Sequence, residues 1–121
     1  MKDPSNPVCR TISTLLARIG DKWTVLVVST LGDGPRRFNE LRREIPSVSQ
    51  RMLTLTLRNL ERDGLVNRTV TPSIPPRVDY ERTDLGRGLS KPVEALGKWA
   101  FDHRSEIESA RAKFDGRNED R

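Results

Sequence analysis

Side chains capable of covalent or metal chemistry are few in this chain of 121 residues, which has one cysteine, Cys9, and one histidine, His103. A single cysteine cannot form an intramolecular disulfide, and no cluster of Cys and His has the spacing of a zinc site. No serine or cysteine nucleophile motif accompanies His103. The sequence therefore predicts that the protein is not an enzyme and has no metal site and no cofactor.

Hydrogen bonding to nucleic acid is a second kind of chemistry, and the stretch SVSQRMLTLTLRNLERDGLV at 47–66 could provide it. Its LTLTL segment alternates like a half-buried strand, but Leu53, Leu57 and Leu60 share one face at the helical period, and Gly64 follows where a helix ends. We therefore predict a helix, whose opposite face would carry Gln50, Arg51, Thr54, Leu55 and Arg58. These groups can bond to base edges or phosphates, although Arg51 and Arg58 could equally be ordinary solvated arginines.

The segment before this helix predicts a helix-turn-helix. Phe38, Leu41 and Ile45 recur at helical spacing, and Pro46 closes that short helix. Ser47 and Ser49 flank the tight connection, and either could cap the next helix. In such a pair the second helix is the candidate reader of a DNA major groove.

The segment after this helix predicts a β-hairpin. Runs with β-rich alternation at 65–70 and 78–83 are separated by TPSIPP. The prolines at 72, 75 and 76 would stiffen a protruding loop, and Arg77 beside them could meet a phosphate or a minor groove. A hairpin directly after a recognition helix is the wing of a winged helix, so the predicted fold class is mainly α with a small β-hairpin (α+β).

Two helices are expected ahead of this unit. Ile12, Leu15, Leu16 and Ile19 recur at helical spacing over 8–19, and Gly20 suits the helix end. The next segment, KWTVLVVSTLGDG, has the β-branched content of a buried strand, but Asp21 before it and Gly32 and Gly34 after it favour a helix.

Charge and length agree with a DNA partner. The chain suits one domain, its formal charge is +5, and residues 36–82 hold ten basic and six acidic groups. The longest apolar run, VLVV at 25–28, is too short to span a bilayer or to form a signal-peptide core. We therefore expect a cytoplasmic protein with no membrane partner.

A long apolar seam marks the C-terminal segment, for which we predict one helix over 84–114, kinked or restarted at Pro92. The seam consists of Leu85, Leu89, Val93, Leu96, Ala100, His103 and Ile107, with Trp99 beside it. It could belong to a core helix that folds back over the domain. The favoured interpretation is dimerisation with the N-terminal helix of a partner, because the seam exceeds what a small core can cover. The tails at 1–7 and 115–121 are predicted to be flexible.

Four motifs carry a resemblance to a known family: GDKW at 20–23, GPRRFNELRR at 34–43, LRNLERDGLV at 57–66 and PPRVDYERTDLGR at 75–87. Together they resemble the HxlR-type winged helix-turn-helix transcriptional regulators over about 8–103. Two positions depart from that pattern. Leu55 stands where a polar residue is frequent, and Asp84 stands where proline is frequent, which leaves Thr83 and Asp84 as alternative caps.

The resemblance implies a homodimeric DNA-binding repressor or activator with a winged helix-turn-helix domain over 8–107. Its parts would be the helix-turn-helix at 36–64, the wing at 65–83, and dimerisation helices at 8–19 and 84–114. The partner would be double-stranded DNA, as a palindromic operator, and a small-molecule or oxidant effector is possible. Candidate DNA contacts then include Arg36, Arg37, Ser49 and Arg77 besides the five helix residues named above.

Cys9, at the N-terminal end of the first helix, is a candidate redox sensor. The helix N-terminus and neighbouring Arg10 would both favour its thiolate, and some members of the family resembled sense electrophiles or oxidants through an N-terminal cysteine. The alternative is a small buried apolar residue at a dimer interface.

Overall fold

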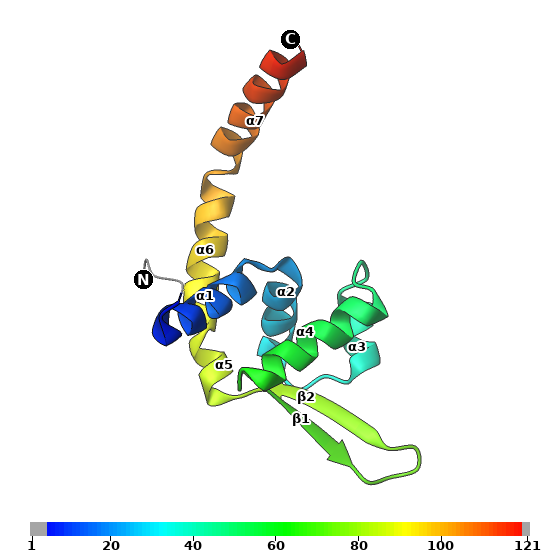
Figure 1. The fold of residues 1–121 in the computed structure, drawn as a ribbon. Helices are drawn as coiled ribbons and strands as arrows, with labels where there is room; N and C mark the ends of the chain where they lie inside the picture. The colour runs from blue at the N-terminus through cyan, green and yellow to red at the C-terminus, as the bar shows by residue number, and fades with distance from the viewer. Residues whose placement is uncertain (1–4, 120–121) are drawn as a thin grey trace. The chain divides into compact units, whose positions relative to one another are not determined.

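The computed structural model describes residues 5–119, which form two compact units, one ending at Ser90 and the other beginning at Lys91. The first unit contains, in order, α1 (Pro7–Gly20), α2 (Lys22–Thr30), the 3-10 turn η1 (Leu31–Asp33), α3 (Phe38–Glu44), α4 (Gln50–Arg62), β1 (Val66–Thr71), β2 (Arg77–Arg82) and α5 (Asp84–Gly88) (Figure 1). Helix α6 (Ser90–Asp102) begins at the boundary, and α7 (Arg104–Glu119) completes the second unit. The predicted fold class, mainly helical with one β-hairpin, is confirmed.

Helix α4 settles the choice between a strand and a helix for LTLTL. Ser49 is its N-cap, and the Ser49 hydroxyl accepts a hydrogen bond from the backbone N–H of Met52 at 3.0 Å. Leu53 and Leu60 are completely buried and Leu57 nearly so, which fixes the rotation of the helix about its axis. The helix ends before Gly64, whose φ of 76° is one that side chains with a Cβ rarely adopt.

The core lies where α2, α3, α4 and the start of β1 meet. Helix α2 packs against α4, and Asp21 caps α2 by accepting from the backbone N–H of Trp23 at 2.8 Å, as predicted. Its β-branched residues Val27 and Val28 face the core, so burial outweighs their low helix propensity. The side chain of Val48, in the turn between α3 and α4, is buried in the same core.

The hairpin has six residue pairs in antiparallel register, from Val66 opposite Arg82 to Thr71 opposite Arg77. Arg36 adds a third short segment, because its backbone exchanges two hydrogen bonds of 2.9 Å with Tyr80 of β2. The hairpin is thereby held on the side of β2 by the chain that leads into α3.

A close junction joins the end of α4, the start of β1 and α5. Thr83 caps α5 by accepting from the backbone N–H of Gly86, which decides between the two predicted caps, and its hydroxyl also donates to the carbonyl oxygen of Gly64 at 2.6 Å. A Cβ on Gly86 would lie 2.1 Å from the carbonyl oxygen of Leu65, so only glycine fits there.

The C-terminal segment was predicted as one helix over 84–114 that is kinked or restarted at Pro92, and a restart is found two residues earlier, at Ser90. It contains three helices, and Pro92 lies in the first turn of α6, where no intrahelical partner for a proline N–H is needed. A second break falls at His103, between α6 and α7. Residues 115–119 were predicted to be a flexible tail, but they belong to α7. The predicted flexible tail at 1–7 is wrong at position 7, because α1 already begins there. The remaining tail predictions, at 1–4 and 120–121, lie outside the described residues.

No helix within residues 5–119 is both long and apolar enough to cross a membrane.

Candidate nucleic-acid interface

The candidate reading surface is the outer face of α4. Gln50, Arg51, Thr54, Leu55 and Arg58 are all exposed, whereas the leucines on the opposite face are buried. Leu55 is 51% exposed, although it is a large apolar side chain. Because the buried leucines fix the helix rotation, the five outer side chains all project from the same face of α4.

Three of these five residues border a hollow shared with the wing. Gln50, Thr54 and Arg58 line a cavity of about 530 Å³ together with Arg68 of β1 and Tyr80 of β2. Arg51 and Leu55 lie outside this lining. The outer face of α4 therefore has one edge that meets the wing and one edge that is independent of it.

The hydroxyl groups of Thr54 and of the N-cap Ser49 each make one hydrogen bond to the backbone of α4. Thr54 donates its hydroxyl hydrogen to the carbonyl oxygen of Gln50 at 2.8 Å, which leaves its oxygen as an acceptor. The Ser49 oxygen accepts the capping bond and keeps its hydrogen for a further acceptor such as a phosphate. Both residues can still bind DNA, each in one hydrogen-bonding role.

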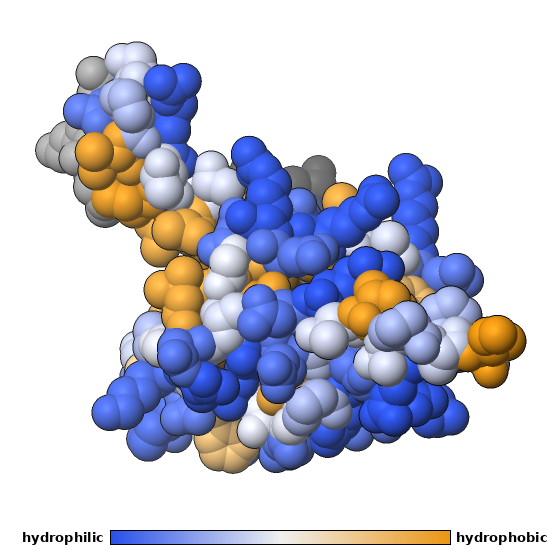
Figure 2. Space-filling view, turned by 90° about the horizontal axis from the view of Figure 1, so that it is seen from below, coloured by the Kyte–Doolittle hydropathy of each residue, from blue (hydrophilic) through white to orange (hydrophobic). Residues whose placement is uncertain are grey.

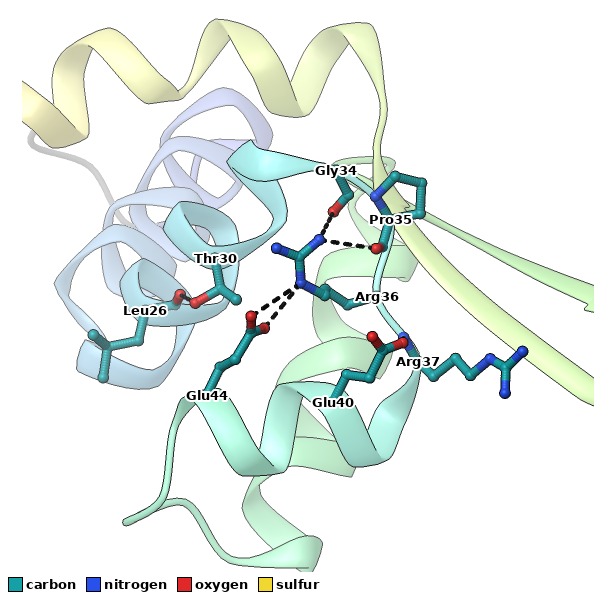
Figure 3. Close-up of polar contacts among 8 residues, drawn as sticks. All are labelled: Leu26, Thr30, Gly34, Pro35, Arg36, Arg37, Glu40 and Glu44. Carbon is teal, nitrogen blue, oxygen red and sulfur yellow. Dashed lines mark hydrogen bonds and ion pairs between the residues drawn. The ribbon is translucent and has the colours of Figure 1, made fainter.

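Arg36 is held within the protein. Its Nε lies 2.9 Å from Oε2 of Glu44, and its Nη1 donates to the carbonyl oxygens of Gly34 at 3.2 Å and Pro35 at 3.0 Å (Figure 3). Its side chain is only 19% exposed. Together with the backbone bridge to Tyr80, these bonds tie the two ends of α3 to the wing.

The neighbouring Arg37 behaves differently, since its exposed side chain points away from that cluster in Figure 3. Its backbone N–H donates to Oε1 of Glu40 at 2.9 Å, which caps α3. The two adjacent arginines, which sequence reasoning treated alike, thus have one inward and one outward side chain.

A second hollow, of about 1040 Å³, lies between the start of α3 and the wing. Its cations are Arg37, Arg43 and Arg77, and Asn39 and Ser73 add neutral hydrogen-bonding groups. The Nε of Arg77 is paired with Asp79 at 2.9 Å, but its side chain remains 53% exposed. Arg37 and Arg77 were predicted from separate motifs, and the fold brings them to one place. Arg43 was not among the predicted contacts. The second pair of arginines in GPRRFNELRR, to which it belongs, could have indicated it.

Most of the visible face in Figure 2 is hydrophilic, with isolated hydrophobic patches on the larger part of the molecule. Arginine supplies most of the positive charge along residues 36–82, and its planar guanidinium suits phosphate oxygens and guanine edges. This surface is complementary in charge and in hydrogen bonding to a nucleic acid, whose phosphates are negative and whose bases carry hydrogen-bonding groups.

Cys9 lies in the first turn of α1 and is 7% exposed. Among the residues that the structure describes, no group of three or more metal-ligating side chains could hold an ion. The thiol is therefore buried and not part of a disulfide.

The residues predicted for dimerisation fall into two sets. On α1, Leu15 and Leu16 are exposed, whereas Ile12 and Ile19 are partly buried. In the C-terminal segment Leu96 and Trp99 are more than half exposed, Ala100 is exposed, and Leu89, Val93, His103 and Ile107 are partly buried. Trp99 stacks on His103 with ring centroids 4.6 Å apart.

One further contact was not foreseen. Arg18 of α1 donates from Nε to Oδ2 of Asp63 at 3.0 Å, and Asp63 is the C-cap of α4. The side chains are 21% and 12% exposed. The first helix is thus tied to the end of the candidate reading helix.

Comparison with known proteins agrees with this geometry. The HxlR-like helix-turn-helix family matches residues 18–108. YybR of Bacillus subtilis, described as an HTH-type transcriptional regulator, is 46% identical over 94 residues, which are 78% of this chain and 75% of YybR.

Two solved structures are similar as well. The redox regulator HypR in its reduced form is 43% identical, with a TM-score of 0.74 over 82% of this chain and 98% of HypR. Diamide-treated YodB of B. subtilis is 33% identical, with a TM-score of 0.69 over 80% of this chain and 96% of YodB. By sequence and by fold, the chain belongs to the HxlR-like helix-turn-helix family of transcriptional regulators.

Proposed function

We propose that this protein is a homodimeric regulator that binds a palindromic operator, with α4 of each copy in a major groove. The observation that carries the proposal is the outer face of α4, where five exposed side chains lie together because buried leucines on the opposite side fix the rotation of the helix. A helix of this kind fits the major groove, and its side chains can distinguish all four base pairs there.

Within this proposal the candidate contacts divide into two roles. Gln50, Arg51, Thr54, Leu55 and Arg58 contact base edges, because they lie on the outer face of α4. Ser49, Arg37 and Arg77 contact phosphates, because they lie at the helix start and in the basic hollow beside the wing. Arg36 supports the wing instead of contacting DNA, because its guanidinium is held by Glu44 and two carbonyl groups.

A dimer follows from the limited reach of one recognition helix. Two copies held about one DNA turn apart would read two half-sites, which raises affinity and leads us to expect a palindromic operator. The exposed apolar side chains of α1 and α6, such as Leu16, Leu96 and Trp99, support this assembly. Because chromosomal DNA is the proposed partner, we place the function in the cytoplasm, and the proposal includes no cofactor and no catalytic residue.

The proposal is tested by fluorescence anisotropy of the reduced protein on duplex DNA from the region upstream of its own gene, with and without a large excess of unrelated DNA. Binding that survives the competitor supports a sequence-specific regulator. Binding that the competitor abolishes would favour a general nucleic-acid-binding protein. Little binding to either DNA would favour a winged helix that contacts other proteins.

A second candidate function is a response to oxidants through Cys9. It is favoured by the similarity to HypR, named as a redox regulator, and by the position of the only thiol of this chain in the first turn of α1. With one cysteine per chain, oxidation of Cys9 to a disulfide joins it to a second copy or to a low-molecular-weight thiol, with two electrons and two protons passing to the oxidant.

This second function is tested by treating the protein with diamide, which takes up those electrons. We expect operator affinity to change in the wild type and to stay constant in Cys9→Ser. Complete modification of Cys9 by mass spectrometry with unchanged operator binding would contradict it.

A further inference from the structure

The tip of the wing carries an apolar side chain wholly in solvent. Ile74, between the strands of the hairpin, has a relative exposure of 104%. The other large apolar side chains called exposed among the described residues range from 38% to 65%. Isolated apolar side chains on a surface are common. A completely exposed isoleucine, however, contributes no apolar burial to the stability of the fold.

The loop around Ile74 is built to be stiff. Prolines 72, 75 and 76 restrict the backbone dihedrals on both sides, and the Ser73 hydroxyl donates to the carbonyl oxygen of Pro75 at 2.7 Å. Much of the conformational entropy that binding would otherwise cost is therefore already lost in the free protein. A stiff loop that presents an apolar side chain in this way is preorganised for a partner.

The surroundings of the loop indicate which partner. Ser73, Pro75 and Pro76 line the same hollow as Arg37, Arg43 and Arg77. Glu40 is the one carboxylate in that lining and caps α3, and Asp79 pairs with Arg77, whereas Arg37 and Arg43 have no ion pair among the described residues. An apolar tip next to a hollow whose arginines outnumber its carboxylates matches a DNA groove, whose apolar sugar walls lie between two rows of phosphates.

We propose that Ile74, supported by Pro75, is an apolar probe of the minor groove beside each half-site and selects A·T pairs there. A G·C pair adds the guanine amino group to the groove floor, where it takes up space and would lose its hydrogen bonds to water beneath an apolar side chain. An A·T pair has no such group. The inference rests on the proposed function, because α4 must first place the wing on DNA.

The test uses operator duplexes selected by the competitor experiment and trimmed by footprinting. Each flanking A·T pair is replaced in turn by G·C and by inosine·C, which has the minor groove of A·T and the major groove of G·C. We expect G·C to weaken binding of the wild type about tenfold at one or two positions, and inosine·C to restore it.

Two variants complete the experiment. In Ile74→Ser the G·C, inosine·C and A·T duplexes should bind alike. Val70→Ser, which changes a half-exposed apolar residue on β1, should keep the preference of the wild type. Both side chains are exposed enough for the variants to fold, which thermal melting verifies.

The outcomes separate this inference from the proposed function. If inosine·C behaves like G·C, or if Ile74→Ser keeps the preference, the operator is still read but the minor-groove probe is wrong. If the wild type binds no duplex in the presence of competitor, the proposed function fails and the probe fails with it.

Discussion

Arg18 of α1 and Asp63, the C-cap of α4, form an ion pair of 3.0 Å in a partly buried position. A carboxylate at a helix C-terminus is opposed by the negative end of the helix dipole, so Asp63 depends on the cation beside it. The pair stabilises the end of α4 and also fixes α1, which carries Cys9, against the helix that we propose reads DNA.

This geometry predicts an asymmetry between two substitutions. Arg18→Gln leaves the carboxylate unpaired and should lower the free energy of unfolding by about 1–2 kcal/mol, less than for a fully buried pair because both groups keep some contact with water. Asp63→Asn removes the unfavourable charge as well and should cost less. Urea denaturation measures both.

Arg10→Gln is the control, because Arg10 lies at the hollow beside Asp63 without an ion pair among the described residues. It should leave the midpoint nearly unchanged. Equal losses for Arg10→Gln and Arg18→Gln would mean that net charge, and not the pair, determines stability.

Adjacent arginines offer a second prediction. Arg36→Gln removes the bonds to Glu44 and to two carbonyl groups, so it should destabilise the fold by about 1 kcal/mol, because Glu44 is 43% exposed and the pair is partly screened. Arg37→Gln should leave stability unchanged but weaken DNA binding, with a slope of log affinity against log salt that is smaller by about one. Thermal melting and anisotropy at several salt concentrations measure the two effects.

The opposite pattern would contradict the assignment. A stable Arg36→Gln protein with a reduced salt slope would show that Arg36, and not Arg37, meets the phosphate.

A third prediction separates base reading from phosphate binding. Arg51→Ala should cost about 1–3 kcal/mol on the operator and relax the choice of base at one position in each half-site. Arg77→Ala should weaken binding evenly across sequences, since phosphates carry no base identity. Competition with a library of single-base operator variants measures both, and equal loss on all sequences for both variants would contradict the division of roles.

Gly86 gives a prediction about stability alone. Gly86→Ala places a Cβ against the carbonyl oxygen of Leu65, which must move, so we expect a loss of about 1–3 kcal/mol. Gly88→Ala is the matched control in the same helix, because its Cβ would meet nothing within 4 Å. Melting temperatures should fall only for Gly86→Ala, and a similar fall for both would indicate an effect of helix α5 that is independent of the contact.

The proposed dimer can be tested on α6. Leu96→Glu adds a charge to a side chain that is 58% exposed, so each copy should still fold while the apolar contact between copies is lost. Light scattering after size-exclusion chromatography should show a monomer, and operator binding should weaken about a hundredfold because each copy then binds one half-site.

Phe114→Glu provides the comparison, since Phe114 is 56% exposed on α7 but outside the predicted seam. It should remain dimeric. A wild-type monomer at micromolar concentration would contradict the dimer directly.

The sequence predicted α4 well because a strong apolar period and a terminal glycine agree there, and that agreement outweighs the local alternation of LTLTL. The caps at Asp21 and Ser49 were predictable for a similar reason, since a cap depends on neighbours two or three residues away. The hairpin was predicted because its two strands lie close in sequence.

Other features depend on contacts between residues far apart in sequence. The Arg18–Asp63 pair joins positions separated by 45 residues, so no local pattern indicated it. Arg36 and Arg37 are identical in type, and the inward direction of Arg36 depends on Glu44 at the far end of α3 and on the backbone bridge to Tyr80. In the C-terminal segment the restart was predicted at Pro92 and occurs at Ser90, whereas the break at His103 was missed because the apolar seam continues across it.

The junction at Thr83 and Gly86 has a consequence for how the wing can vary. Thr83 and Gly64 lie on opposite sides of the hairpin, 19 residues apart, and the hydrogen bond between them closes the base of the wing independently of the loop at 72–76. Insertions or deletions confined to that loop therefore leave the end of α4 and the start of α5 in place. Relatives could lengthen or shorten the wing and so change how far it extends along DNA, while the recognition helix keeps its setting in the domain.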